Sequence, residues 1–211
     1  MTNQPSAAEI AELVCTRLSH DVIGNIGAVA NAVELLEEGD MDFLDDIKSI
    51  LKTSSAVLSA RLKFFRLAFG LDNANLDKLD LVEETIRGYL KTIGNQNYPI
   101  ELDFNLRDSR YSKGVLLTVM IVADCLIRGG CLHIGTDSSG RVTVSAECST
   151  PPSAEKMAQI RAVLTGENAE LNAQFAPVFY LLSWLKKAKI NLYIQGNSRL
   201  GFIMASTKDN N

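Results

Sequence analysis

The sequence predicts an α+β protein, in which an N-terminal helical hairpin forms a dimeric four-helix bundle and a C-terminal α/β sandwich follows. Two long stretches with helical spacing of apolar residues fill the first 70 positions. Beyond Gly70, shorter helical segments mixed with strand-like ones replace them. The polar, turn-like segment LDNANLDKLD lies between the region of long helices and the region of shorter elements. We therefore expect domains at residues 1–72 and 73–211.

The first predicted helix covers residues 7–38, where no proline interrupts an amphipathic pattern and Gly39 supplies an end. On a helical wheel its core face consists of Leu18, Val22, Val29, Val33 and Leu36, flanked by Val14 and Ile26. The opposite side carries His20, in line with the small or polar residues Thr16, Gly24, Gly27 and Asn31. We therefore expect the His20 ring to face solvent.

A second helix is predicted from Asp42, the expected N-cap, with Asp45 in its first turn. One seam of this helix contains Leu44, Ile47, Leu51, Leu58 and Phe65, with Ser54 and Arg61 at the remaining positions. A second seam contains Phe43, Ile50, Val57 and Phe64. The short connection makes the two helices antiparallel, and their apolar faces are too broad for a lone hairpin in water. The simplest cover is the hairpin of a second copy.

The second half of the chain alternates between helix and strand patterns. Helices are predicted at residues 81–92, 113–128, 154–164 and 176–188. Strands are predicted at residues 100–105, 131–136, 141–147, 190–195 and 201–205. Together these segments favour a layer of helices against a mixed sheet.

Composition excludes several classes of function. A net charge of -4 argues against a nucleic-acid surface. No window reaches the roughly 18 apolar residues of a membrane span, and the N-terminus lacks a signal pattern, so we expect a cytoplasmic protein without membrane contact. The four cysteines, Cys15, Cys125, Cys131 and Cys148, form no CxxC pair, and with only two histidines they favour neither a zinc site nor a disulfide framework.

His20 has neighbours suited to chemistry on its ring. An imidazole titrates near neutral pH, so one ring nitrogen can be neutral and nucleophilic, as covalent transfer through histidine requires. Asp21 could orient the ring by accepting a hydrogen bond from the other nitrogen, or act as a base. Arg17 adds a cation on the same helix. The pattern is equally that of an ordinary surface histidine beside a solvated aspartate.

A hairpin that turns near residue 40 brings residue 61 level with residue 20. Arg61, with Lys63 or Arg66 a turn away, could then stabilise a phosphoryl group or dock an acidic partner. These three cations are also typical of a solvated face that keeps a bundle soluble.

The run LSHDVIGNIGAVANAVELLEE resembles the H-box helix of histidine kinase dimerisation domains, and more closely the alphaproteobacterial histidine phosphotransferases of the ChpT type. The segment VLLTVMIVADCLIRGG resembles a helix of their degenerate ATPase-like domain. The resemblance implies a homodimer that takes phosphate on His20 from the receiver domain of a hybrid kinase and passes it to receiver domains of response regulators. We therefore expect His20 and Asp21 to be catalytic residues and Arg17, Gly24 and Arg61 to be binding residues.

Two positions depart from the kinase pattern. Kinases usually carry threonine or asparagine four positions after the histidine and proline at five, whereas this chain has Gly24 and Asn25. The proline kink is therefore absent, as is the side chain on which a phosphatase activity at the fourth position would depend.

The parts of a nucleotide site are not found in the sequence. An ATP site needs a magnesium-binding asparagine, an acidic glycine loop and a glycine-rich lid. The corresponding places hold Val122, the segment SAECSTPPS and a stretch between residues 165 and 175 with only Gly166. We expect no ATP, no metal and no cofactor, and we interpret the lone carboxylates Asp124 and Glu147 as ordinary polar residues rather than magnesium ligands.

Three other interpretations remain open at this stage. One is a histidine kinase fragment with an unrecognised ATP site, and another is a non-catalytic scaffold that binds receiver domains. A thiol enzyme built on Cys15 is less favoured, because the wheel puts Cys15 off the exposed face. His133, in a predicted strand, is expected to pack or to form an ordinary hydrogen bond.

Overall fold

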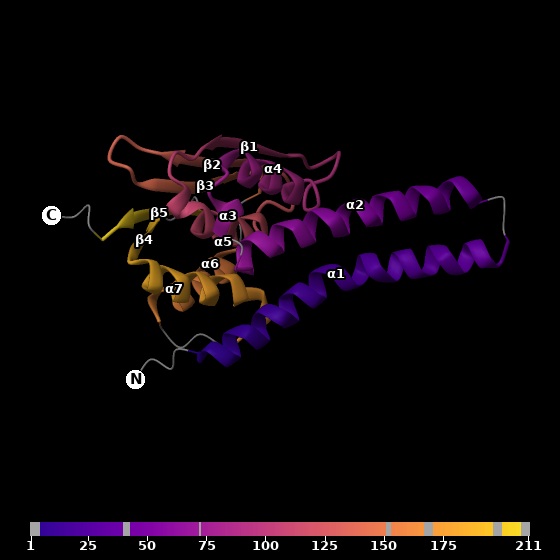
Figure 1. Cartoon of the computed structure of the whole chain (residues 1–211), viewed down its shortest axis with the longest axis horizontal. Helices are drawn as coiled ribbons and strands as arrows, with labels where there is room; N and C mark the ends of the chain where they lie inside the picture. Colours follow the sequence, from indigo (N-terminus) through magenta and orange to yellow (C-terminus); the bar gives the residue numbers. More distant parts are fainter. Residues whose placement is uncertain are drawn as a thin grey trace.

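The computed structural model of the chain describes residues 5–39, 43–71, 73–150, 153–166, 171–195 and 200–207. A long helical hairpin comes first, and a two-layer α/β part follows and packs against one end of the hairpin (Figure 1). The predicted α+β class is confirmed. None of the helices in the described ranges is both long enough and apolar enough to cross a membrane.

The first arm of the hairpin is α1 (Ala7–Glu37). It begins with a capping box, in which the Ser6 hydroxyl accepts the Glu9 backbone N–H and the Glu9 carboxylate accepts the Ser6 N–H at 2.7 Å. It ends just before Gly39, which adopts a φ of +75° that a residue with a side chain rarely takes. The predicted end of the helix is confirmed to within one residue.

The second arm is α2 (Leu44–Phe69). Its predicted N-cap, Asp42, lies outside the described residues. α1 and α2 are in contact along the hairpin, and Ile47 and Ser54 of the first predicted seam are buried. At the far end the buried Lys113 side chain donates to the Gly70 carbonyl at 2.7 Å, which satisfies a carbonyl left over at the helix terminus. The predicted division at 72/73 falls between α2 and the next helix and stays a prediction.

In the described residues of the α/β part, five further helices and two 3-10 turns follow the hairpin. The helices are α3 (Asn73–Leu76), α4 (Leu79–Leu90), α5 (Ser112–Ala123), α6 (Ala154–Thr165) and α7 (Ala176–Ala188), and the turns are η2 (Ser109–Tyr111) and η3 (Ala173–Phe175). The strands are β1 (Ile100–Asn105), β2 (Gly130–Thr136), β3 (Val142–Cys148), β4 (Ile190–Gln195) and β5 (Leu200–Ser206). The other helices and the strands lie within a few residues of a predicted segment except at the end of α5, whereas α3 falls in the segment predicted as a turn.

The five strands form one mixed sheet in the order β1-β2-β3-β5-β4. β1 and β2 are parallel and the other neighbours are antiparallel. Apolar side chains alternate along the strands, so that residues such as Leu132, Val144 and Phe202 are buried on the face that the helices cover. The sheet is therefore a support that fixes the helices next to the hairpin.

The predicted helix over residues 113–128 is too long, because α5 ends at Ala123. The N–H groups of Cys125 and Leu126 donate to carbonyls only three residues back, so the chain tightens into turns. Gly129 and Gly130 then take φ values of +78° and +142° to enter β2. A Cβ at Gly130 would lie 2.1 Å from a backbone oxygen of β3, which requires glycine there.

The hairpin meets the α/β part through aromatic packing. Phe64 of α2 stacks on Tyr89 of α4, with ring centroids 4.0 Å apart and an angle of 16° between the planes. Phe65 and Leu67 are buried at the same junction. The opposite end of the hairpin, where α1 connects to α2, extends away from the α/β part (Figure 1).

Candidate functional site

His20 lies on α1 with 85% of its side chain exposed, so the orientation predicted from the helical wheel is confirmed. The helix surface beyond it is open, because a Cβ built on Gly24 or Gly27 would meet nothing within 4 Å. Another molecule can therefore approach the ring along this face of α1. The structure brings His20 and Gly24 together on one surface, as the sequence predicts.

Asp21 is mostly covered, with 16% of its side chain exposed, and it faces the His20 ring. Its Oδ1 lies 3.7 Å from Nδ1 of His20, which is longer than a hydrogen bond but close enough for electrostatic attraction. A carboxylate on this side favours a proton on Nδ1, since an N–H is attracted to it. The other ring nitrogen, Nε2, is then the one with a free electron pair.

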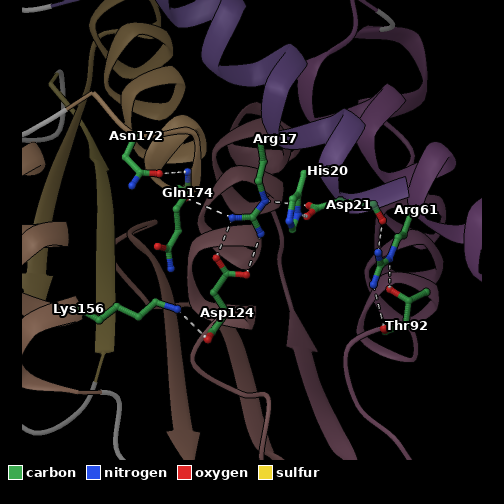
Figure 2. Close-up of polar contacts among 9 residues, drawn as sticks. All are labelled: Arg17, His20, Asp21, Arg61, Thr92, Asp124, Lys156, Asn172 and Gln174. Carbon is green, nitrogen blue, oxygen red and sulfur yellow. Dashed lines mark hydrogen bonds and ion pairs between the residues drawn. The ribbon is translucent and has the colours of Figure 1, made fainter. Parts of the chain in front are cut away.

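Arg17 is turned towards the α/β part, and only 12% of its side chain is exposed. Its Nε donates to Asp21 Oδ2 at 2.9 Å, and its two terminal nitrogens donate to both carboxylate oxygens of Asp124 at 2.9 and 3.1 Å (Figure 2). One of them also donates to the Gln174 carbonyl at 3.3 Å. Arg17 is therefore close to His20 on the same helix, as expected, but its guanidinium group is bound by the carboxylates of Asp21 and Asp124.

The charges around Arg17 hold it firmly in its ionised form. Burial alone would lower the pKa of Arg17, but the hydrogen bonds and charges of Asp124 and then Asp21 outweigh it and raise the pKa above its ordinary value. The Tyr89 hydroxyl lies within the field of the same groups. Burial, followed by the charges of Asp124 and Asp21, raises the pKa of Tyr89. This tyrosine therefore stays neutral at physiological pH.

Arg61 of α2 lies beside Asp21 of α1, which confirms the register expected for the hairpin. Its guanidinium donates to the backbone carbonyl of Asp21, and also to the hydroxyl and carbonyl oxygens of Thr92 at 3.2 and 3.3 Å (Figure 2). Thr92 follows α4, so this contact ties the hairpin to the α/β part. The other two cations expected here, Lys63 and Arg66, are exposed on α2.

Sequence reasoning missed the partners that the α/β part supplies. The arginines bind Thr92, Asp124 and Gln174, which lie 31, 107 and 157 residues away from them in the sequence. One signal was available for Asp124, because a carboxylate at the end of an apolar helix is rarely left without a cation. The expectation that it is an ordinary polar residue was therefore incomplete.

A small hollow lies behind Asp124, between α5, α6 and α7. Its empty volume is about 210 Å³, and it is lined by Ile121, Asp124, Lys156, Ile160, Gln174, Phe175 and Val178. Lys156 donates to the Asp124 carbonyl at 2.9 Å (Figure 2). Within the described ranges, no three His, Cys, Asp or Glu side chains are arranged to hold a metal ion.

The cysteines and the second histidine have different surroundings. Cys15 is exposed, so the expectation that it lies off the accessible surface is wrong for the single chain. Burial raises the pKa of the Cys125 thiol to about 11, which keeps it unreactive. His133 lies on the sheet with Nδ1 3.4 Å from Asp103 and Nε2 3.9 Å from Glu147.

Three comparisons relate this chain to known proteins. The model of the histidine phosphotransferase C-terminal domain matches residues 81–198, which is more than half of the chain. Protein phosphotransferase ChpT of Brucella abortus (strain 2308) is 46% identical over 65 residues, which cover 31% of this chain and only 30% of that relative. The solved structure of a bacterial phosphotransferase superposes with a TM-score of 0.78 at 24% identity, over 95% of this chain and 98% of the other.

Proposed function

This chain belongs to the histidine phosphotransferase family, and from that premise we propose that His20 is the residue that carries the phosphoryl group. In this proposal the receiver domain of a hybrid histidine kinase supplies the group from an aspartyl phosphate. His20 then passes it to the receiver aspartate of a response regulator. The observation that carries the proposal is the exposed His20 ring on an open helix surface, with a carboxylate behind Nδ1.

The proposed transfer is a displacement at phosphorus. The Nε2 electron pair of His20 forms a bond to phosphorus while the bond from phosphorus to the aspartate oxygen breaks, and its electrons leave with the aspartate carboxylate. The proton on Nδ1 stays in place, so the ring becomes a cation bearing the phosphoryl group. Asp21, 3.7 Å from Nδ1, stabilises that charge. The same steps in reverse deliver the group to the next aspartate.

The far end of the hairpin supports a homodimer with a four-helix bundle. There the apolar residues Ile26, Val33, Leu36, Phe43 and Ile50 are each at least 40% exposed in the single chain. We call these five residues the distal face. An apolar surface that continues along two helices favours a protein partner, and a second copy has the matching face. We place this dimer in the cytoplasm, as the sequence led us to expect.

The interior of the α/β part supports a function without ATP. All twelve residues of α5 are buried, including Val122 at the place expected for a magnesium-binding side chain. The hollow beside Asp124 is lined mostly by apolar side chains, with Lys156 as the one cation among the described residues around it, whereas a triphosphate needs several positive groups around it. Phosphate would therefore come from a phosphorylated protein rather than from a nucleotide.

The test is transfer from a phosphorylated receiver domain to the purified chain. We expect the wild type to become labelled and His20→Gln to stay unlabelled, because glutamine offers a similar polar bulk without a nucleophilic nitrogen. The chain contains one other histidine, so His133→Gln is the matched control and should be labelled like the wild type. Circular dichroism of both variants checks that the fold is unchanged.

Three outcomes would contradict the proposal. Labelling that persists in His20→Gln would remove His20 from the reaction. Labelling by ATP alone, without a receiver, would favour a kinase with its own nucleotide site. Binding of receiver domains without any transfer in the wild type would favour a scaffold.

A further inference from the structure

One chain of polar contacts links His20 to the α/β part. Asp124, at the end of α5, binds Arg17 through both of its carboxylate oxygens, at 2.9 and 3.1 Å. Arg17 then donates from Nε to Oδ2 of Asp21 at 2.9 Å, which leaves Oδ1 of Asp21 facing the His20 ring at 3.7 Å. Figure 2 shows Arg17 between the two carboxylates. Asp124 itself does not touch His20.

The geometry of Arg17 depends on both carboxylates. A guanidinium group has five donors in a rigid fork, and an arginine with one carboxylate partner tends to bind it with two parallel hydrogen bonds. Here each terminal nitrogen donates one N–H to Asp124, and Asp21 accepts a single bond, from Nε. Without the Asp124 charge, Arg17 is free to turn both of its nitrogens to Asp21 and take that carboxylate away from the ring.

The charges of the cluster point the same way. Arg17 carries one positive charge against the two carboxylates, and all three side chains are less than a fifth exposed. Among these three side chains the carboxylates outnumber the cation by one, beside a ring that becomes cationic when it is phosphorylated, while Arg61 and Lys156 add positive charge at the backbone carbonyls of Asp21 and Asp124. Removal of the Asp124 charge would leave Arg17 and Asp21 as a neutral pair, with less attraction for the phosphorylated ring.

Asp124 is also fixed on its other side. Lys156 of α6 donates to its backbone carbonyl at 2.9 Å, and α5 around it is fully buried. A carboxylate held in this way cannot follow Arg17 if the hairpin moves. The position of the α/β part is thus transmitted to the His20 ring through two side chains.

We propose that Asp124 is a positioning residue for phosphotransfer, which acts through Arg17 to keep the Asp21 carboxylate on the Nδ1 side of His20. This inference rests on the proposed function of His20 as phosphoryl carrier. The inference gives the α/β part a role in the chemistry of the site. Asp124 of that part does not contact the His20 ring and acts on it through Arg17 and Asp21.

The test compares Asp124→Asn with Asp103→Asn. Asp103 faces the other histidine, His133, at 3.4 Å, so its variant removes a carboxylate of the same kind from a ring outside the site. Nitrogen-15 NMR of the two imidazoles reports which ring nitrogen carries the proton. Single-turnover labelling by a phosphorylated receiver gives the rate at saturation and, separately, the receiver concentration for half-maximal rate.

We expect Asp124→Asn to raise the fraction of His20 rings protonated on Nε2 and to leave His133 unchanged. Its saturating rate should fall roughly tenfold, as expected for the loss of about one charge-assisted hydrogen bond, while the half-saturating concentration stays constant. Asp103→Asn should alter the His133 signals alone and transfer at the wild-type rate. Arg17→Lys, which keeps the charge but loses the fork, should reproduce the Asp124→Asn defect.

The inference is overturned if Asp124→Asn lowers the melting temperature but leaves the His20 signals and the saturating rate unchanged. If Asp124→Asn does not fold, the same measurements are made on Arg17→Lys, and unchanged His20 signals with an unchanged saturating rate again overturn the inference. A wild type that is not labelled at His20 contradicts the proposed function instead, and the NMR of Asp124→Asn still decides whether Asp124 positions the ring. The two failures are therefore distinguishable.

Discussion

The two ends of the helical hairpin have similar sequence patterns but very different surroundings. Near the α/β part, the apolar residues Phe64, Phe65 and Leu67 are almost completely covered by the same chain. Towards the connection between α1 and α2, the distal face keeps residues such as Val33 and Ile50 at 42% and 40% exposure. The difference teaches that an apolar pattern predicts that a face will be covered, but not by which partner.

His20 lies where these two regions meet. On one side, Arg17 and Arg61 tie the hairpin to the α/β part at Asp124 and Thr92. On the other side, the open surface begins at Gly24, and the distal face follows from Ile26. A residue in this position has a fixed backbone and an accessible side chain, and a group-transfer residue needs both.

The largest effect on stability is expected at the covered end. Phe64→Ala removes a buried ring that stacks on Tyr89 and should lower the free energy of unfolding by about 3–5 kcal/mol, measured by denaturant titration. The matched control is Leu62→Ala in the same helix, at a side chain 56% exposed, with an expected change within about 0.5 kcal/mol. Equal losses in the two variants would contradict the contrast between covered and exposed faces.

At the distal end we expect a change of assembly rather than of fold. The wild type should have twice the 23.0 kDa mass of the chain in light scattering, and Val33→Glu should have the single mass with an unchanged circular dichroism spectrum. A buried carboxylate without a partner strongly disfavours the interface. Leu71→Glu, at an exposed apolar residue outside the distal face, should stay dimeric. A wild type of single mass at tens of micromolar would disprove the dimer.

The smallest effect on stability, of opposite sign, is expected at Gly24. Gly24→Ala adds a methyl group in open space and a better helix former, so the free energy of unfolding should rise by about 1 kcal/mol in thermal melts. Transfer from the receiver should nevertheless become slower, because the methyl group lies where the partner approaches the ring. Faster or unchanged transfer would show that the receiver does not contact this part of α1.

Local signals predicted most of the fold correctly. The long helices, the strands and the exposed side of α1 follow from periodicity, because each depends on residues close together in the chain. The end of α5 was missed, since it depends on Gly129 and Gly130 meeting backbone atoms of other segments. The N-cap of α2 is Phe43, which forms no side-chain cap hydrogen bond, and the predicted cap, Asp42, lies outside the described residues.

The site shows where sequence reasoning stops. His20, Asp21 and Gly24 lie within five positions, so a helical wheel relates them directly. Asp124 is 107 residues from Arg17, and only the packing of α5 beside the hairpin brings the two together. Arg17 was therefore recognised as a neighbour of His20, while the carboxylate that determines its direction was not.

The most direct test of the account is the chemical location of the phosphoryl group after transfer. Tandem mass spectrometry under neutral conditions, with phosphorus NMR of the intact protein, should find one acid-labile phosphoryl group on Nε2 of His20. A phosphoryl group on His133, on an aspartate or on a hydroxyl side chain, with His20 unmodified, would contradict the central claim.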